Sequence, residues 1–365
     1  MKSFGFIQST ITVLNVLCGM ILIIVSFSDS VSPDQIMFFS FLGLLFPFVF
    51  VIQLCFLIYW LIARNRTMFF IIFCSLLLCW KPFSHYFPVH PRRVDISEKN
   101  VIKMLTYNIM SFGYQDHTVA KPNPIVEYIA KSGADIVCLQ EYMVGTLPNY
   151  MTQEKVDRAL YMYPYHVTVP LVKRNRFTIG LAIYSKYPVL NSRKIRYDSS
   201  FNGSSIHEID VKGKKLVVVN NHLESFKLTM DDRAKYADFL KNMNSDSFDD
   251  FKDAVQKKLS TAYQIRAEQA EIVADEIEKL NGDHILVCGD FNDTPISYAY
   301  RTVKGSLVDS FAESGNGLGI TYNQNYYWFR IDHILHSRNM RAYSAKVDSI
   351  STSDHYPMWC YVEMY

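Results

Sequence analysis

The residues best suited to chemistry in this sequence lie in the stretch Ile285–Pro295, which reads ILVCGDFNDTP. An apolar run typical of a buried β-strand ends there at Gly289 and is followed by Asp290, Asn292 and Asp293. In α/β sheets, ligands bind at the edge where such strands end. Carboxylate and amide oxygens this close together suit a hard cation and a phosphate group. Taken alone, the stretch would fit a strand followed by an ordinary Asx turn.

Five further segments place similar side chains beside apolar, strand-like runs. They are Asn108, Glu141 and His222 at the ends of runs, Asp332 within a run, and Asp354 with His355 just before one. A single residue of this kind is most often a turn former or a helix cap. Six segments that offer Asn, Asp, Glu or His favour one shared site. Oxygen ligands without thiolates indicate Mg²⁺, Mn²⁺ or Ca²⁺ more than zinc.

The same six segments resemble, in order, the motifs of the endonuclease/exonuclease/phosphatase (DNase I-like) superfamily. They are Leu105-Thr106-Tyr107-Asn108, Leu139-Gln140-Glu141, Asn220-Asn221-His222-Leu223, Gly289-Asp290-Phe291-Asn292, Arg330-Ile331-Asp332-His333 and Ser353-Asp354-His355. The resemblance covers residues 101–365 and implies an α/β fold, a four-layered α/β/β/α sandwich. It also implies hydrolysis of phosphoester bonds with a divalent metal, usually Mg²⁺, with Mn²⁺ as an alternative.

The resemblance assigns the metal to four residues. Glu141 would be the principal ligand, with Asn108 beside it. Asp290 would share the metal, and Asp354 would either bind the ion or support a residue that does. An anionic phosphodiester repels a hydroxide nucleophile, so a cation at this place would neutralise its non-bridging oxygens.

The resemblance assigns catalysis to His222, Asp290, Asn292, Asp332 and His355. Asp290 would orient or deprotonate water, and Asn292 would donate an N–H bond to a phosphate oxygen. His355 would contact the phosphate or act as an acid–base group, held by Asp332 through its Nδ1–H. His222 would polarise a phosphate or protonate a leaving group, as its type suggests in DNase-like, sphingomyelinase-like and inositol-phosphatase-like members. Which of these groups is the general base stays open.

The elements that must position these side chains alternate from residue 101 onwards, as expected of two packed sheets flanked by helices. The predicted strands are Val101–Tyr107, Asp135–Glu141, Ile179–Ser185, Val189–Tyr197, Ser205–Val211, Lys215–Asn220, Ile285–Gly289, Phe329–Leu335, Ala342–Val347 and Tyr356–Val362. The predicted helices are Pro124–Lys131, Gln153–Leu160, Asp231–Met243 and Phe248–Leu280.

Three apolar runs precede this part of the chain: Phe4–Phe27, Ile36–Ala63 and Met68–Trp80. The first two exceed the ~20 residues needed to cross a bilayer. The third is shorter and could cross if residues 82–87 lie in the far interface. We therefore predict a multi-pass integral membrane protein. It would have about three transmembrane helices within residues 1–87, a linker at 88–100 and a catalytic domain at 101–365.

Basic residues in the short loops predict the orientation. Lys2 precedes the first apolar run, and the Arg64–Arg66 loop separates the second from the third. The positive-inside rule places both in the cytoplasm. Three crossings then put the catalytic domain outside the cytoplasm. If the third run does not cross, the domain is cytoplasmic.

The balance of charges gives only weak evidence on the class of substrate. The whole chain has 37 basic and 35 acidic residues. Four of the basic residues, Lys2, Arg64, Arg66 and Lys81, and two of the acidic ones, Asp29 and Asp34, lie before residue 82. Residues 82–365 therefore hold 33 basic and 33 acidic residues. Formal neutrality weakens the case for a nucleic-acid substrate, because duplex binders usually carry a basic surface. Membrane attachment makes a phospholipid headgroup attractive, and both classes stay open. The lipid bilayer is the other expected partner, and no protein partner is evident.

Two other function classes fit parts of the sequence. One is a non-catalytic membrane receptor that uses the sandwich as a phosphate-binding module, but the intact set of polar residues speaks against a decayed enzyme. The other is a glycosidase with Glu141 and Asp290 as its carboxylate pair, and the surrounding Asn and His residues are surplus to that mechanism.

Features outside the motifs carry weaker expectations. Arg266 fits either an anchor between a helix and the sheet or a surface ion pair. Lys173–Arg176 reads as a solvated basic loop, and Tyr326–Trp328 as an aromatic rim or an ordinary surface loop. Glu224 has no assigned role.

Overall fold

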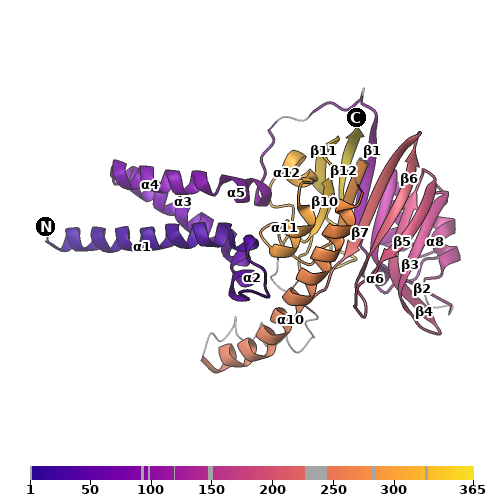
Figure 1. Ribbon diagram of the computed structural model, residues 1–365, viewed down its shortest axis with the longest axis horizontal. Coiled ribbons are helices and arrows are strands. Elements are labelled where there is room, and N and C mark those ends of the chain that lie inside the picture. Colours follow the sequence, from indigo (N-terminus) through magenta and orange to yellow (C-terminus); the bar gives the residue numbers. More distant parts are fainter. Residues whose placement is uncertain are drawn as a thin grey trace.

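The computed structural model describes residues 2–91, 94–97, 99–118, 120–146, 151–226, 245–280, 284–324 and 328–365. In this part of the chain, two six-stranded sheets lie beside a bundle of N-terminal helices (Figure 1). The predicted helix at 231–243 lies outside the described residues, as do Tyr326 and Tyr327 of the expected aromatic rim.

Each sheet mixes strands from distant parts of the sequence. The first sheet has the order β11-β12-β1-β2-β4-β3 and the second the order β5-β6-β7-β8-β10-β9. The strands of the first are β1 (Val101–Asn108), β2 (Ile136–Gly145), β3 (Tyr165–Lys173), β4 (Phe177–Ser185), β11 (Met340–Val347) and β12 (Met358–Met364). Those of the second are β5 (Val189–Ile195), β6 (Gly203–Val211), β7 (Lys214–His222), β8 (His284–Asp290), β9 (Val308–Asp309) and β10 (Asp332–His336).

Side chains alternate between two apolar layers along the central strands, as the period of two requires. In β8, Leu286 and Cys288 point into the core between the sheets, whereas Ile285 and Val287 point outward. In β1, Met104 enters the core between the sheets. All five side chains are buried, so both faces of β8 are covered.

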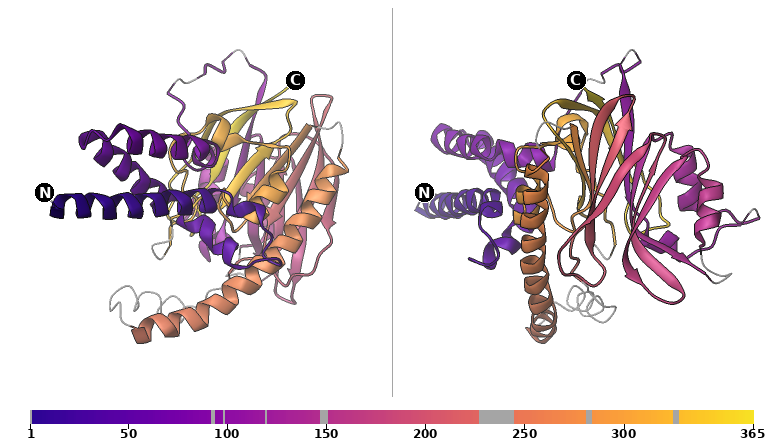
Figure 2. Two further views of the ribbon diagram at one scale, coloured as in Figure 1. Left: turned by 60° about the vertical axis from the view of Figure 1, so that its left-hand side comes forward. Right: turned by 45° about the vertical axis from the view of Figure 1, so that its right-hand side comes forward.

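Helices cover the outer faces of both sheets (Figure 2). They are α7 (Pro124–Lys131) and α8 (Gln153–Ala159) on the first sheet, and α10 (Ser245–Glu278) and α11 (Tyr298–Lys304) on the second; α6 (Met110–Gly113) and α12 (Ser310–Ser314) are short connections. The layers run helix, sheet, sheet, helix, which confirms the predicted four-layered α/β/β/α sandwich.

Helix α7 shows how the local sequence builds one of these layers. Asn123 caps it by accepting hydrogen bonds from the N–H groups of Ile125 and Val126, and Pro124 occupies its first turn. Ile125, Val126 and Ile129 recur at helical spacing and are buried against the first sheet. Loss of such a cap costs about 1 kcal/mol.

The two parallel pairs bring distant strand ends together. β1 pairs with β2 so that Asn108 lies opposite Gln140, and β7 pairs with β8 so that His222 lies opposite Asp290. The antiparallel strand β10 adds Asp332, which also lies opposite Asp290. The sheet registers therefore deliver the predicted chemical residues to one end of the sandwich.

Two differences from the predicted strands have physical causes. Strand β3 is absent from the predicted strands; it contains Pro170 and is the edge strand of the first sheet, where proline is tolerated. Strand β10 starts at Asp332 and not at Phe329, since Phe329 instead forms an isolated bridge with Tyr322. Asp332 therefore stands at a strand end and not inside one.

The N-terminal helical region contains two helices long and apolar enough to cross a membrane, spanning Gln8–Ser30 and Phe38–Ile62. The elements are α1 (Lys2–Ser26), η1 (Ser28–Ser30), α2 (Phe38–Leu42), η2 (Gly43–Leu45), α3 (Phe46–Ile62), α4 (Arg66–Leu78) and α5 (Trp80–Tyr86). Helices α4 and α5 are bent by 59° at Cys79 and make a third span only if the bent pair crosses as one.

A buried polar network joins three of these helices. Asn15 of α1 donates to Gln53 of α3 at 3.1 Å and accepts from the indole N–H of Trp60 at 3.1 Å. Gln53 in turn donates to Ser75 of α4 at 3.4 Å. Side-chain hydrogen bonds of this kind hold helices together where both sides of the contact are apolar.

The helical region is docked onto the sandwich. Arg301 of α11 pairs with Asp29 at 3.3 Å, and Arg330 donates to the backbone carbonyl of His85 at 2.6 Å. Figure 1 shows α10 extending beyond the sheets on the side where these helices lie.

The first residues of the segment expected as a linker at 88–100 are hydrogen-bonded to the sandwich. The His90 ring meets the Gly315 carbonyl at 2.7 Å, and the N–H of Gly317 donates to the Pro88 carbonyl at 3.0 Å. These contacts connect the segment to the loop after α12.

We expect stability to fall in acid partly through His207. This side chain is fully buried between the hydroxyls of Ser192 and Ser205, and burial lowers its pKa to about 4. The unfolded chain binds a proton near pH 6.5, so stability is full above that pH and is lost as pH falls towards 4, by about 3 kcal/mol. The His207→Gln variant should therefore show a shallower fall of the thermal unfolding midpoint between pH 7 and 4.5.

The matched control for this experiment is His284→Gln, a partly exposed histidine at the start of β8. Equal acid slopes for the wild type and the His207→Gln variant would contradict the role of His207.

Candidate active site

Asn108 is the centre of the site. It ends β1 and is 1% exposed. Its side-chain N–H₂ donates to Glu141 at 3.2 Å and to Asp290 at 3.0 Å, while its oxygen accepts the N–H of Met110 at 3.1 Å. The amide therefore joins carboxylates from both sheets. The role of Asn108 as a metal ligand stays a prediction. Its side-chain oxygen, the atom that would bind a metal, accepts a hydrogen bond from the backbone N–H of Met110.

Glu141 is aimed at Asn108 by an irregularity in β2. The register between β2 and β4 shifts between Leu139 and Tyr142, and Glu141 adopts a φ of 51°. A bulge of this kind re-aims a side chain, and a left-handed non-glycine residue is a strained feature typical of functional sites. Burial, and after it the neighbouring carboxylate of Asp354, raises the pKa of Glu141.

Asp290 and His222 face each other across the parallel pair β7 and β8. The Nε2 atom of His222 lies 3.7 Å from a carboxylate oxygen of Asp290 and 3.7 Å from one of Glu141. Burial lowers the pKa of His222 against the opposing effect of Asp290. Gly289 allows the backbones of β7 and β8 to lie this close together, since a Cβ at position 289 would be 2.0 Å from the Asn221 carbonyl oxygen.

His355 and Asp332 form a hydrogen-bonded pair. The Nδ1 atom of His355 lies 2.8 Å from Asp332, so Nε2 points at Asp290, 3.6 Å away. Burial alone would lower the pKa of His355, but the carboxylates of Asp332 and Asp290 outweigh it and hold that pKa well above its ordinary value. The pKa values of His222 and His355 are therefore shifted in opposite directions.

Asn292 stabilises the loop after β8. Its backbone N–H donates to Asp290 at 2.8 Å, and its side-chain amide donates to the Leu223 carbonyl at 3.0 Å. The amide has two N–H groups, so one remains for the predicted bond to a phosphate oxygen. The residue has a φ of 53°, a second strained position within the site.

The donors around Glu141 fit a divalent cation. After burial, the carboxylate of Asp354 is the next cause of the raised pKa of Glu141, and a cation bound at Glu141 would offset this repulsion. Asp290, Asp332 and His355 also offer ligand atoms within 4.8 Å of one another. The hydrogen bond between Asp332 and His355 already uses one of those atoms on each side, so Glu141 and Asp354 are the better place for a metal.

A buried amide pair that was not predicted as part of the site joins the sheets beneath it. Gln140 of β2 donates to Asn220 of β7 at 2.6 Å and to Thr106 of β1 at 3.1 Å. Asn220 donates to the Leu139 carbonyl at 3.2 Å. Polar side chains inside otherwise apolar strand runs are the signal that could have identified them.

Arg266 is an anchor and not a surface ion pair. It is fully buried, and its guanidinium donates to Asp293 at 2.8 Å and to the Glu224 carbonyl at 2.8 Å. Glu224, which had no predicted role, follows His222 by two residues and is itself buried. Helix α10 thus holds the loops after both β7 and β8.

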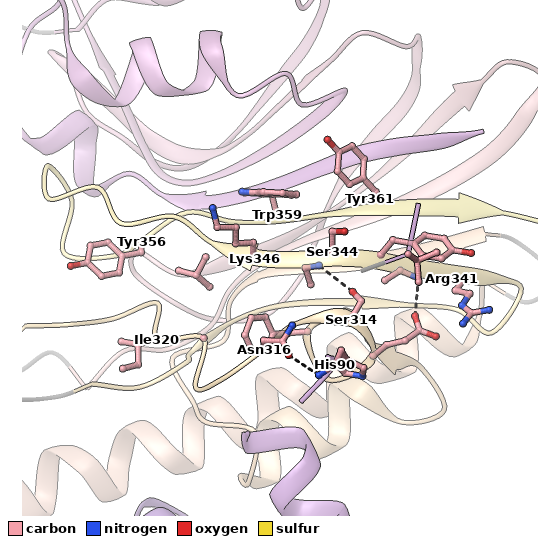
Figure 3. A pocket seen from close by; sticks show the side chains of 18 of the residues that line it. His90, Ser314, Asn316, Ile320, Arg341, Ser344, Lys346, Tyr356, Trp359 and Tyr361 are labelled. Atoms are coloured by element: carbon pink, nitrogen blue, oxygen red, sulfur yellow. Dashed lines mark hydrogen bonds between the residues drawn. The ribbon is translucent and has the colours of Figure 1, made fainter. Parts of the chain in front are cut away.

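A separate cavity of about 870 Å³ lies beside β11 and β12 (Figure 3). Arg341 and Lys346 of β11, Trp359 of β12, His90 and Tyr356 are among its lining residues. Tyr356 follows His355 directly, but none of the predicted catalytic or metal residues lines the cavity.

The sandwich and the histidines and carboxylates at its end define a DNase I-like α/β protein. The sequence matches the model of the Endonuclease/Exonuclease/phosphatase family over residues 105–355, and the chain belongs to that family. Residues 8–86 match a second model, described as a domain of unknown function (DUF8431). No curated protein matches the sequence significantly.

Solved structures share the fold. An endonuclease/exonuclease/phosphatase from Beutenbergia cavernae is 15% identical, with a TM-score of 0.51 and 72% of each chain covered. The human nocturnin catalytic domain, solved with a bound sulfate anion, is 17% identical, with a TM-score of 0.50 over 74% of this chain and 96% of that one. At these identities, the likeness concerns the fold alone.

Proposed function

We propose that this protein is a membrane-anchored phosphoester hydrolase that depends on a divalent metal. The family and the fold make a phosphoester hydrolase the expected class. The observation that supports it most is the meeting of Asn108, Glu141, His222, Asp290 and His355 from five separate segments around one small volume. A role in packing alone would not require Glu141 of one sheet to face His222 and Asp290 of the other.

The metal would be held by Glu141 and Asp354, with Mg²⁺ as the expected ion and Mn²⁺ as an alternative. When bound, it would neutralise the non-bridging phosphate oxygens and lower the pKa of a coordinated water. Asn108 would keep the carboxylates of Glu141 and Asp290 at a fixed separation.

The two histidines would act in different protonation states. The carboxylates of Asp332 and Asp290 favour the protonated form of His355, which would stabilise the negative charge that grows on the phosphate. Burial favours the neutral form of His222, which would polarise the phosphate or transfer a proton at its Nε2 atom. Asp290 lies between them and would orient the attacking water. Groups whose pKa values are pushed apart in this way commonly divide acid and base roles.

The experiment that tests the proposal is hydrolysis by the purified full chain in detergent. The substrates are single- and double-stranded DNA, RNA, sphingomyelin and inositol phosphates, each with Mg²⁺. We expect turnover of a nucleic acid or a phospholipid-type diester, loss of that turnover with EDTA, and its return with added Mg²⁺ or Mn²⁺. Binding without any product would favour the phosphate-binding receptor instead.

We also propose that the helices cross the membrane three times and leave the catalytic domain outside the cytoplasm. Two helices qualify by length and composition, and the bent pair α4 and α5 would supply the third crossing. A reporter fused at Tyr365 should therefore behave as extracytoplasmic, measured with paired alkaline phosphatase and green fluorescent protein fusions. Cytoplasmic fluorescence with no phosphatase activity would overturn this topology.

A further inference from the structure

The N-terminal helices touch the loop that follows the predicted catalytic strand. Gly43 of η2 lies so close to the Ile296 backbone that a Cβ at Gly43 would be 2.0 Å from the Ile296 carbonyl oxygen. Ile296 is 3% exposed and is the one residue of the sandwich among the buried members of the helical region's apolar cluster, within the part of the chain that the structure describes. It stands four residues after Asn292.

A second contact runs through α10. The ring of Phe41 in α2 meets the ring of Tyr263 edge-on, with centroids 5.4 Å apart. Tyr263 also meets Phe226 at 5.3 Å, and the guanidinium of Arg266 lies over both rings, at 5.2 Å and 4.5 Å. Arg266 sits one helical turn after Tyr263, so both side chains lie on the same face of α10.

Arg266 connects this aromatic group to the site. It binds Asp293, the residue after Asn292, and the carbonyl of Glu224, two residues after His222. Gln269, one turn further along α10, accepts the N–H of Glu224 at 2.8 Å. All of these groups except Phe41 and Phe226 are buried, so a movement of one must be accommodated by its neighbours.

We propose that the N-terminal helical region is part of the active-site scaffold. Through Gly43 and Phe41 it positions the loop at 291–297 and the loop at 223–226, and it thereby sets the rate of turnover as well as the location of the protein. Gly43, Phe41, Tyr263 and Arg266 are positioning residues, since none of them contacts the reacting groups. The effect on rate rests on the proposed hydrolase function, whereas the effect on loop order does not.

The test uses the full chain in detergent with a Gly43→Val variant. The added side chain must separate η2 from the Ile296 carbonyl, so amide hydrogen exchange of residues 291–297 should become about tenfold faster while the strand amides of both sheets stay protected. The kcat should fall about tenfold to a hundredfold with little change in KM, because the misplaced loop carries Asn292, whose backbone N–H donates to Asp290. Leu45→Val is the matched control, two residues along and 46% exposed, and should change neither quantity.

The Ile296→Ala variant gives an independent measurement, since it removes the Ile296 side chain from the apolar cluster of the helical region without adding atoms and should increase exchange at 291–297 in the same way. Unchanged exchange in both variants would overturn the proposal, whether or not the chain hydrolyses any substrate. Faster exchange without loss of kcat would show that the helices order the loop but do not set the rate. A wild-type chain without hydrolase activity would refute the proposed function alone. The exchange data would still show whether the helical region orders residues 291–297.

Discussion

Replacement of Asp290 by alanine is expected to lower kcat by about a thousandfold or more, with the fold retained. The carboxylate is 1% exposed, accepts an amide N–H from Asn108, and lies within 3.7 Å of the Nε2 atoms of His222 and His355. Its removal takes away the anion between the two histidines and the group that would orient water. The measurement is steady-state hydrolysis of the best substrate in saturating Mg²⁺.

An exposed aspartate on α10 provides the control for this change, since Asp275→Asn removes a carboxylate that is not among the predicted site residues and should keep full activity. Asp290→Asn keeps the volume of the side chain and should lose turnover like the alanine variant. Near-normal hydrolysis by either Asp290 variant would refute the assigned role. Near-ultraviolet circular dichroism checks that packing survives.

The second large effect is expected at the pair of His355 and Asp332. The His355→Ala variant should lose about 10²- to 10⁴-fold in kcat, since it removes the group that would balance charge on the phosphate. The Asp332→Asn variant should also be strongly impaired. An amide in place of the carboxylate neither favours the Nδ1–H form nor holds the pKa of His355 above its ordinary value.

The double variant separates a paired function from two independent ones. If Asp332 acts through His355, the combined variant should be no slower than His355→Ala alone, because residues that act as a unit give non-additive losses. Losses that multiply would show that Asp332 has a separate task, such as binding the metal together with Asp290.

The layers of the sandwich and the gathering of the site could be predicted because both follow from local patterns. Strand ends such as Asn108, His222 and Asp290 carry polar residues after apolar runs, and parallel pairing brings such ends to one edge. The pattern could not show that Glu141 needs a bulge with a positive φ to face the site. Nor could it reveal β3, whose Pro170 is compatible with a strand only at an edge.

Contacts between distant segments were harder to predict. Nothing local to Gly43 indicates that it lies against the Ile296 carbonyl, since the two residues are 253 positions apart and glycine is common in apolar helices. The sequence around Arg266 fits an anchor and a surface ion pair equally well, and its burial and its bond to Asp293 decide for the anchor. In each case the deciding term is tertiary packing, which overrides what the neighbouring residues prefer.

The hydrogen bonds that join Pro88 and His90 to the loop at 315–317 fix the start of the connection between the helices and β1 on the sandwich. With the helices in a bilayer, the height and tilt of the site above the lipid plane would be set by docking and not by the length of residues 94–100. Extra residues inserted there would not extend the reach of the sandwich. If the sandwich is the proposed hydrolase, its encounters with substrate would depend on what diffuses past a fixed point at the membrane surface.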